Sequence, residues 1–317
     1  MEKPYVIGID MGGTNTAFGI VDARGNVIAK SAIRTNNPDI DAYVKELKEE
    51  CDKLIESVGG IEKIKGIGAG CPNGNHYTGN IEFAPNLPWR GVVPFAKMLA
   101  EAFGVPASIT NDANAAAVGE MTYGVAKGMK NFIMITLGTG VGSGIVIDGK
   151  IVYGHDGFAG ELGHTRIVRN NGRKCGCGRE GCLETYTSAT GVARTAREIL
   201  EIGDRKSSLR NIELKSITSK DVYDAAIEGD EVALEVFDFT GKILGDALAD
   251  FVAFSAPEAI ILFGGLAKSG DLIMKPVVEN MEKNLLNIWQ GKVKVLFSTL
   301  KDADAAVLGA SALAWEL

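Results

Sequence analysis

Residues 5–22 read YVIGIDMGGTNTAFGIVD, and residues 132–148 read FIMITLGTGVGSGIVID. Each segment predicts a strand, a polar glycine turn and a second strand followed by a reverse turn, which together make a β-hairpin. An ungapped alignment of the two segments pairs Asp10 with Thr136, Gly12 with Gly138 and Asp22 with Asp148. The match predicts two related halves, each built around one hairpin.

The hairpin turns have the composition of phosphate-binding loops, because glycines leave backbone N–H groups accessible and hydroxyls lie beside them. The candidate residues are Gly12, Gly13, Thr14 and Asn15 in the first loop and Thr136, Gly138 and Thr139 in the second. One such loop is more often an ordinary turn, but two at matching positions favour a shared anion. Neither loop is a P-loop, since no Gly-Lys-Ser/Thr follows. Neither is a dinucleotide fingerprint, since a strand and not a helix comes next.

Apolar residues spaced by three and four predict helices between the strands, and the chain therefore reads as α/β. The predicted helices cover residues 41–58, 93–103, 112–125, 188–200, 221–228, 231–254, 272–285 and 303–315. Short buried strands are predicted at 107–110 and 259–263, and the polar segment 202–220 is predicted to be a surface excursion. We expect two domains, a small one of residues 1–110 plus 303–317 and a large one of residues 111–302.

The bulk composition limits the class of protein. With 317 residues and 46% hydrophobic content, the chain can bury a sizeable core. A net charge of −7 argues against a nucleic-acid partner. No apolar run approaches the ~18 residues of a membrane span, and the sequence begins without a secretory leader. We therefore expect a cytoplasmic protein without a membrane partner.

A dense cluster of metal-ligating residue types lies between Glu161 and Glu184. It holds one imidazole and three thiols, from His164, Cys175, Cys177 and Cys182. Sulfur with one imidazole suits tetrahedral zinc, and four protein ligands leave no open position for chemistry, so the loop 164–182 predicts a structural zinc site. The alternative is three free cysteines. Disulfides are disfavoured by the odd total of five cysteines and the lack of a leader.

Three motifs together resemble the ROK family of sugar kinases and sugar-responsive repressors: DMGGTN at 10–15, CGCGREGC at 175–182 and FGGL at 263–266. Within that family the chain is most similar to the ATP-dependent glucokinases. The resemblance implies two duplicated actin-like ATPase (ribonuclease H-like) domains with an interdomain cleft. It also implies transfer of the γ-phosphoryl of ATP to the 6-hydroxyl of glucose. The nine residues before Asp10 are too few for the helix-turn-helix that precedes this loop in the repressors.

Two alternatives remain beside a glucokinase. One is a kinase for another hexose, such as fructose, mannose or an N-acetylhexosamine. The other is a non-catalytic sugar sensor, which the acidic residues and both phosphate loops disfavour. The family is commonly oligomeric, so a homodimer is expected.

The resemblance assigns the catalytic base to Asp112, which follows a strand and opens a helix. Taken alone, an aspartate there is more often an N-cap that accepts backbone N–H bonds. A base at this place would accept the proton of the attacking sugar hydroxyl. A helix N-terminus also stabilises its charged form.

The resemblance also implies the ligand contacts. Sugar hydroxyls would meet Asn111, Asp112, Glu161, His164 and Glu184. For the two glutamates the alternative is a solvated rim. Asn73, in a turn that departs from the family's Pro-Gly, is a possible further sugar contact. Asp10 would hold Mg²⁺ against the ATP phosphates, although an aspartate there can also be a turn residue. Gly264 and Gly265 would lie against adenosine, although a bare glycine pair is more often a helix-entry turn.

Overall fold

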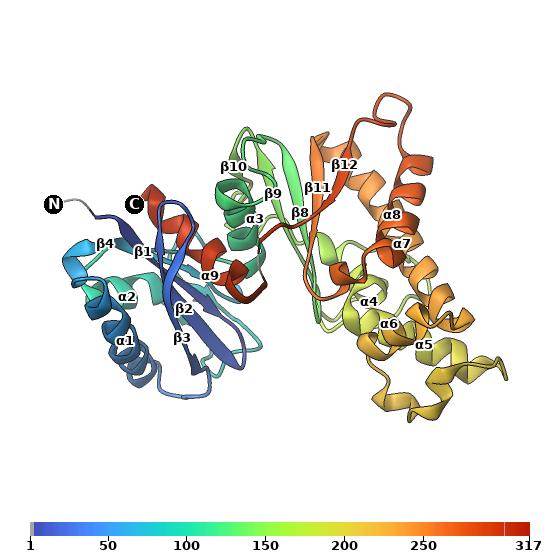
Figure 1. Cartoon of the computed structure of the whole chain (residues 1–317), viewed down its shortest axis with the longest axis horizontal. Coiled ribbons are helices and arrows are strands. Elements are labelled where there is room, and N and C mark those ends of the chain that lie inside the picture. The colour runs from blue at the N-terminus through green and yellow to red at the C-terminus, as the bar shows by residue number, and fades with distance from the viewer. Residues whose placement is uncertain (1–2, 301) are drawn as a thin grey trace. The chain divides into compact units, whose positions relative to one another are not determined.

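The computed structural model describes residues 3–300 and 302–317 (Figure 1). Residues 1, 2 and 301 fall within the predicted domains but lie outside the described part. The chain divides into two compact units. The first comprises residues 1–130, 144–160 and 298–317, and the second comprises residues 131–143 and 161–297. No helix among the described residues is long and apolar enough to cross a membrane.

The first sheet has the strand order β3-β2-β1-β4-β7. Its strands are β1 (Tyr5–Met11), β2 (Asn15–Asp22), β3 (Val27–Arg34), β4 (Ile64–Gly70) and β7 (Ala107–Thr110). The first three are antiparallel neighbours, and β4 and β7 continue the sheet in parallel with β1. Parallel strands end at the same edge, so the residues that follow β1, β4 and β7 lie near one another.

The second sheet has the strand order β10-β9-β8-β11-β12, which repeats the first strand for strand. Its strands are β8 (Phe132–Leu137), β9 (Val141–Ile147), β10 (Lys150–Ile151), β11 (Ala259–Phe263) and β12 (Lys294–Phe297). β11 is parallel to both β8 and β12, as β4 is to β1 and β7. The repeat predicted from the two hairpins is thus confirmed. A separate two-stranded sheet joins β5 (Ile81–Glu82) and β6 (Val92–Val93).

The helices lie close to their predicted positions. They are α1 (Ile40–Ser57), α2 (Phe95–Phe103), α3 (Asp112–Tyr123), α4 (Glu184–Thr187), α5 (Ala189–Ile202), α6 (Ser219–Ile227), α7 (Glu231–Ser255), α8 (Asp271–Asn284) and α9 (Asp302–Leu313). Short 3-10 turns occupy Ile61–Lys63, Leu162–His164, Ser208–Asn211, Leu214–Ser216, Leu266–Ser269 and Ala314–Glu316. Two of these turns form the predicted excursion at residues 202–220.

Helix α1 shows how the sequence sets its own ends. The Asp39 carboxylate caps it by accepting the N–H groups of Asp41 and Ala42. A buried stripe on one side of the helix packs on the sheet. Gly59 and Gly60 then take positive φ angles of 98° and 101°, which stops the helix.

Helix α9 packs unusually close to the first sheet because glycines face it. A Cβ on Gly8 would lie 2.1 Å from the Val307 carbonyl oxygen, and one on Gly68 would lie 1.9 Å from that of Ala310. Gly309 approaches α3 in the same way, with a would-be Cβ 2.7 Å from the Ala115 carbonyl oxygen. The C-terminal helix therefore belongs to the first unit. The core of the second unit is built around α7, which is buried along most of its length.

The compact units differ from the predicted domains. Residues 111–130 and 144–160 pack with the first unit, whereas the prediction assigned them to the large domain. The packing of α3 with α9 accounts for the first of these segments. The boundary near residue 110 stays a prediction about where the duplicated halves meet in sequence.

Candidate active site and metal centre

In the first unit, Asp10 at the end of β1 and Asp112 at the start of α3 bring two carboxylates together. Burial and the charge of Asp112 raise the pKa of Asp10 to about 6. Asp112 keeps solvent-accessible surface, yet the surrounding protein displaces enough water to raise its pKa as well. The Ala113 N–H, which Asp112 Oδ1 accepts at 2.9 Å, works in the opposite direction. A buried carboxylate whose charged form is destabilised by a neighbouring acid forms a site that favours a cation.

The N-cap of α3 is Asn111 and not Asp112. Asn111 has an extended backbone, and its Oδ1 accepts the Asn114 N–H at 2.7 Å. Asp112 is the first residue inside the helix. The alternative of Asp112 as N-cap is therefore wrong, although its Oδ1 accepts the Ala113 N–H. Because the cap uses the oxygen of Asn111, its NH₂ group is the part that can donate to a ligand.

The first glycine loop is fixed by its backbone. Gly12 donates to the Asn15 carbonyl at 2.9 Å, and Thr35 donates to the Thr14 carbonyl at 2.9 Å. A Cβ on Gly13 would lie 2.8 Å from the Asn86 carbonyl oxygen, so the segment after Ala84 supports the loop. Beneath it, the Thr16 hydroxyl bonds Thr35 at 2.8 Å and Tyr43 at 2.5 Å. Gly13, Thr14 and Asn15 remain exposed.

The second glycine loop is fixed by the start of α5 and by Glu184. The Gly138 carbonyl accepts the Ala189 N–H at 2.8 Å, and the Thr139 carbonyl accepts the Thr190 hydroxyl at 2.9 Å. Glu184 Oε2 accepts the Val141 N–H at 2.9 Å. Thr136 Oγ1 accepts the Gly142 N–H at 3.1 Å, so its hydroxyl closes the hairpin.

The three glycines of the second unit that were predicted to contact the nucleotide fall into two kinds. Gly264 has φ 104°, and a Cβ there would lie 2.7 Å from the Leu137 carbonyl oxygen, so its conformation and packing both require glycine. Gly138 and Gly265 have ordinary φ angles, and nothing lies within 4 Å of a Cβ on either. Neither reason requires glycine at those two positions.

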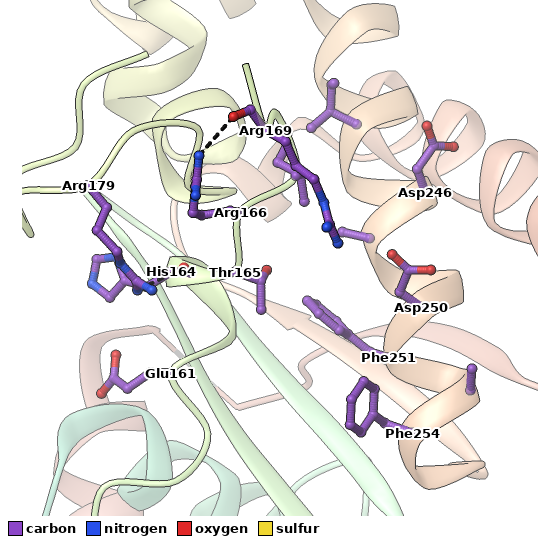
Figure 2. A pocket seen from close by; sticks show the side chains of 14 residues that line it. Glu161, His164, Thr165, Arg166, Arg169, Arg179, Asp246, Asp250, Phe251 and Phe254 are labelled. Carbon is purple, nitrogen blue, oxygen red and sulfur yellow. Dashed lines mark hydrogen bonds between the residues drawn. The ribbon is translucent and has the colours of Figure 1, made fainter. Parts of the chain in front are cut away.

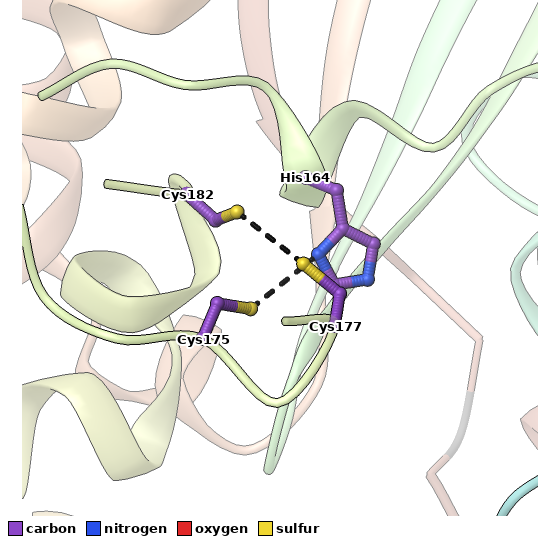
Figure 3. Close-up of side chains that lie close together, drawn as sticks. All are labelled: His164, Cys175, Cys177 and Cys182. Atoms are coloured by element: carbon purple, nitrogen blue, oxygen red, sulfur yellow. Dashed lines mark hydrogen bonds between the residues drawn. The ribbon is translucent and has the colours of Figure 1, made fainter. Parts of the chain in front are cut away.

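The predicted metal ligands come together in the second unit (Figure 3). Ligand atoms of His164, Cys175, Cys177 and Cys182 all lie within 4.8 Å of one another. The sulfurs of Cys177 and Cys182 are 3.7 Å apart, and Cys175 Sγ lies 3.7 Å from His164 Nδ1. Ligands on a tetrahedral zinc are separated by about 3.8 Å when the Zn–S bond is ~2.3 Å. The donor set and its spacing therefore fit zinc.

The charge state of the cluster also suits a cation. Burial raises the pKa of Cys175 to about 12. At Cys177 burial acts in the same direction, but hydrogen bonds from the Arg179 backbone and guanidinium outweigh it and lower the pKa to about 6. One exposed thiolate at neutral pH gives the first ligand, and metal binding would then deprotonate the others.

The metal loop closes on itself through glycines and one arginine. A Cβ on Gly181 would lie 1.7 Å from the Val168 carbonyl oxygen, so no side chain fits there. Arg173 is 8% exposed and bonds both the loop and α5. The sequence analysis missed it, because arginine is no metal ligand and an isolated arginine carries no motif. Its place two residues before Cys175 was the available signal.

The remaining predicted sugar ligands lie in both units. In the second unit, Glu184 Oε1 lies 3.7 Å from Cys175 Sγ. Gly163 precedes His164, and a Cβ on it would lie 2.0 Å from the Val141 carbonyl oxygen, so the backbone beside His164 packs tightly on β9. Glu161 is exposed at the start of the same turn. In the first unit, Asn73 has φ 51° and its amide nitrogen donates to the Glu82 carbonyl at 3.0 Å. The same nitrogen donates to the Phe83 carbonyl at 3.4 Å, so only the Asn73 oxygen is left for a ligand.

A cavity of about 1010 Å³ lies in the second unit between the residues around His164 and one side of α7 (Figure 2). Arg166, Arg169 and Arg179 line one wall, and Asp246, Asp250 and Phe254 line the other. Arg166 and Arg179 donate to the Arg169 and His164 carbonyls. This cavity contains Glu161 and His164 but none of the other predicted sugar ligands.

A family model described as ROK family matches residues 6–316. The chain belongs to the ROK family. It is 38% identical over 315 residues to the glucokinase of Halalkalibacterium halodurans, covering 98% of this chain and 94% of that protein. The crystal structure of a ROK family glucokinase from Streptomyces griseus, in complex with glucose and AMPPNP, matches with a TM-score of 0.78 and 32% identity. That match covers 99% of this chain and 100% of the other.

A third relative is the ROK hexokinase of Thermus thermophilus. Its crystal structure matches with a TM-score of 0.83 and 28% identity, covering 98% of each chain. The family resemblance drawn from the three motifs is confirmed, and with it the actin-like ATPase fold of the ROK proteins.

Proposed function

We propose that this protein is an ATP-dependent glucokinase that transfers the γ-phosphoryl of ATP to the 6-hydroxyl of glucose. The observation that carries the proposal is the full-length match to a ROK glucokinase complex with glucose and AMPPNP. The pair of acids at Asp10 and Asp112 supports catalysis and disfavours a pure sugar sensor, which needs neither. The same proposal places the protein in the cytoplasm, where ATP is available and thiols stay reduced.

Asp112 acts as the general base in this proposal. Its carboxylate accepts the proton of the sugar hydroxyl as that oxygen attacks phosphorus, which is worth ~10²–10⁴ in rate. A pKa raised toward neutral pH makes the Asp112 carboxylate a stronger proton acceptor. Asp112 is the first residue of α3, where the helix dipole stabilises the charged form of the carboxylate.

Asp10 holds Mg²⁺, which neutralises the charge of the phosphates when bound. Asp10 is half-buried, and the neighbouring Asp112 destabilises its charged form. A divalent cation bound there would offset both the burial and the repulsion. The loop residues Gly12, Gly13, Thr14 and Asn15 and the loop residues Thr136, Gly138 and Thr139 bind the same triphosphate. Gly264 and Gly265 lie against adenosine.

The sugar is bound by Asn111, Asp112, Glu161, His164 and Glu184, with Asn73 offering only its oxygen. Carboxylates accept from hydroxyls, and the Asn111 NH₂ group donates to one. His164 Nδ1 lies 3.7 Å from Cys175 Sγ, so zinc held there would fix the tautomer of the ring and leave Nε2–H as a donor. The metal is therefore structural, and it orients a sugar ligand.

The pocket of Figure 2 supports a homodimer. Its lining holds three arginines and three acids, so this face is neutral on a chain whose net charge is −7. Two copies can approach there without repulsion, and Arg169 of each can meet the acids of the other. Phe254 is 94% exposed at its edge, and a second copy would cover it.

The dimer is tested by light scattering after chromatography. Phe254→Ser is expected to convert the dimer into monomers, whereas Ile202→Ser, a control at a residue 88% exposed elsewhere in the same unit, leaves it intact. A wild-type monomer, or a dimer in the Phe254 variant, refutes this interface.

The function is tested by measuring ADP release from Mg-ATP across a panel of hexoses, with zinc determined on the same sample. The highest kcat/KM is expected for glucose, with glucose 6-phosphate as product. The match to a ROK hexokinase keeps a second candidate, a kinase for another hexose. A higher kcat/KM for fructose, mannose or an N-acetylhexosamine would favour it, and no ADP release with any sugar would refute both.

A further inference from the structure

Arg173 connects two parts of the second unit that the proposed function treats as separate. One is the metal loop, from His164 to Cys182, and the other is the glycine loop Gly138–Gly140. The connection is continuous in hydrogen bonds, and every step lies within one compact unit. It rests on the proposed function only in that the glycine loop is taken to bind nucleotide.

The backbone of Arg173 belongs to the metal loop. Its carbonyl accepts the Gly181 N–H at 2.9 Å, next to the ligand Cys182. Its own N–H donates to the Tyr186 hydroxyl at 2.9 Å. Movement of the ligand-bearing loop therefore moves the base of this side chain.

The side chain of Arg173 belongs to the corner between α4 and α5. Nη1 donates to the Thr185 carbonyl at 2.9 Å and to the Gly191 carbonyl at 3.4 Å. Nη2 donates to Thr195 Oγ1 at 2.9 Å and to Glu198, and Nε donates to Glu198 at 3.1 Å. All five guanidinium N–H groups are used, and the group also lies 4.5 Å from the centre of the Tyr186 ring.

The start of α5 then holds the glycine loop. Ala189 N–H and the Thr190 hydroxyl bind the carbonyl groups of Gly138 and Thr139. In a planar trans peptide the C=O and the following N–H point in opposite directions. Fixing these two carbonyls therefore fixes the direction of the Thr139 and Gly140 N–H groups, and we take these two groups as donors to the phosphate that the glycine loop is proposed to bind.

We propose that Arg173 is a positioning residue through which occupancy of the metal loop sets the nucleotide affinity of the glycine loop. With zinc bound, the loop holds Arg173, Arg173 holds the first turns of α5, and α5 holds the phosphate-binding amides in place. Without zinc, the loop loses its shape and the amides lose their preorganisation, although no metal ligand touches the nucleotide.

The test compares Mg-AMPPNP dissociation constants, measured by calorimetry on zinc-loaded and chelator-treated protein. In the wild type, zinc removal is expected to weaken binding about tenfold, within the usual range of coupling between two sites. Zinc-loaded Arg173→Met is expected to bind about tenfold more weakly, with little further loss on chelation. Arg173→Lys keeps the charge but not the fork of donors, and is expected to fall between.

Arg194→Met is the matched control. Arg194 also pairs with Glu198, at 2.7 Å, but its side chain is 43% exposed and bonds neither the metal loop nor the α4–α5 corner. It is expected to retain the wild-type affinity and the wild-type response to zinc. Loss of affinity in both variants alike would show a general effect of destabilising α5 and would overturn the proposal.

Three other outcomes are informative. If zinc-loaded Arg173→Met binds Mg-AMPPNP as tightly as Arg194→Met, the proposal is refuted whatever the activity. If the wild type binds no Mg-AMPPNP at all, the proposed function fails first. Should chelation unfold the protein, the comparison of the zinc-loaded variants alone decides.

Discussion

The two glycine loops occupy the same place in the same topology, yet they carry different chemistry. The first follows Asp10, whose pKa is raised to about 6 by burial and by a neighbouring acid. The second follows Thr136, whose neutral hydroxyl closes its own hairpin. Gly13 is supported by a segment of the first unit, and Gly138 by helix α5. The two halves share the geometry of the turn, while the pair of acids lies in the first unit and the metal-ligating cluster in the second.

The largest expected effect comes from the charged half. Asp112→Asn keeps the volume of the side chain but removes the proton acceptor, so kcat should fall by ~10²–10⁴. Glucose affinity, measured by calorimetry, should change little, because the asparagine oxygen still accepts a hydrogen bond from a sugar hydroxyl. Turnover near the wild-type rate would remove Asp112 from its role.

The second effect tests whether the cluster of the second unit binds zinc. Cys182→Ser removes one of the four ligands, and the zinc content should fall from about one per chain to none. The loss of one buried thiolate ligand should cost the second unit several kcal/mol of stability. Cys51→Ala, which alters a buried thiol in the first unit far from the cluster in sequence, should keep full zinc. Retained zinc in the Cys182 variant would contradict the assigned ligand set.

The third effect compares Asp10 with Thr136, which holds the equivalent position in the second hairpin. The pKa of Asp10 is raised from 3.8 to about 6 in the folded protein, so the unfolded chain gives up this proton more readily. Stability is therefore full below about pH 4 and is lost as the pH rises through about 6. Without Mg²⁺, Asp10→Asn should raise the free energy of unfolding by about 1–3 kcal/mol at pH 8 and give no gain at pH 4.

Thr136→Val is the control for that experiment, because Thr136 is the neutral counterpart of Asp10 in the second hairpin. It loses the bond to the Gly142 N–H and should cost about 1 kcal/mol at both pH values. Urea titrations at the two pH values measure both variants. Equal pH dependence in the two would mean that the halves do not differ in charge as described.

The smallest effect concerns a turn in the first unit. Asn73 has φ 51°, which glycine adopts more easily, but its amide nitrogen also bonds the Glu82 carbonyl. The two terms oppose each other, so Asn73→Gly should change stability by less than about 1 kcal/mol. The KM for glucose should stay within about twofold, since the bonds to the Glu82 and Phe83 carbonyls leave only the oxygen for the sugar. A rise of tenfold or more would show that this oxygen binds the sugar.

Much of this molecule could be predicted because two segments repeat. The hairpins at 5–22 and 132–148 indicated the duplication, and apolar spacing located the long helices to within a few residues. The packing of 111–130 against α9 could not be predicted, because it depends on a contact between Gly309 and the backbone of α3. Which residue caps α3 could not be predicted, since Asn111 and Asp112 are both good caps and only the backbone conformation distinguishes them. Arg173 was missed because its five donors meet partners spread over residues 185–198.

The most direct test of the account is amide hydrogen exchange with and without Mg-AMPPNP and glucose. If both halves bind one triphosphate, exchange should slow together at residues 12–15 and at residues 138–140, in protein that keeps its zinc. The helix α6, which carries no proposed ligand, serves as the reference. Protection at one glycine loop alone, or at neither, would contradict a nucleotide site shared by the duplicated halves.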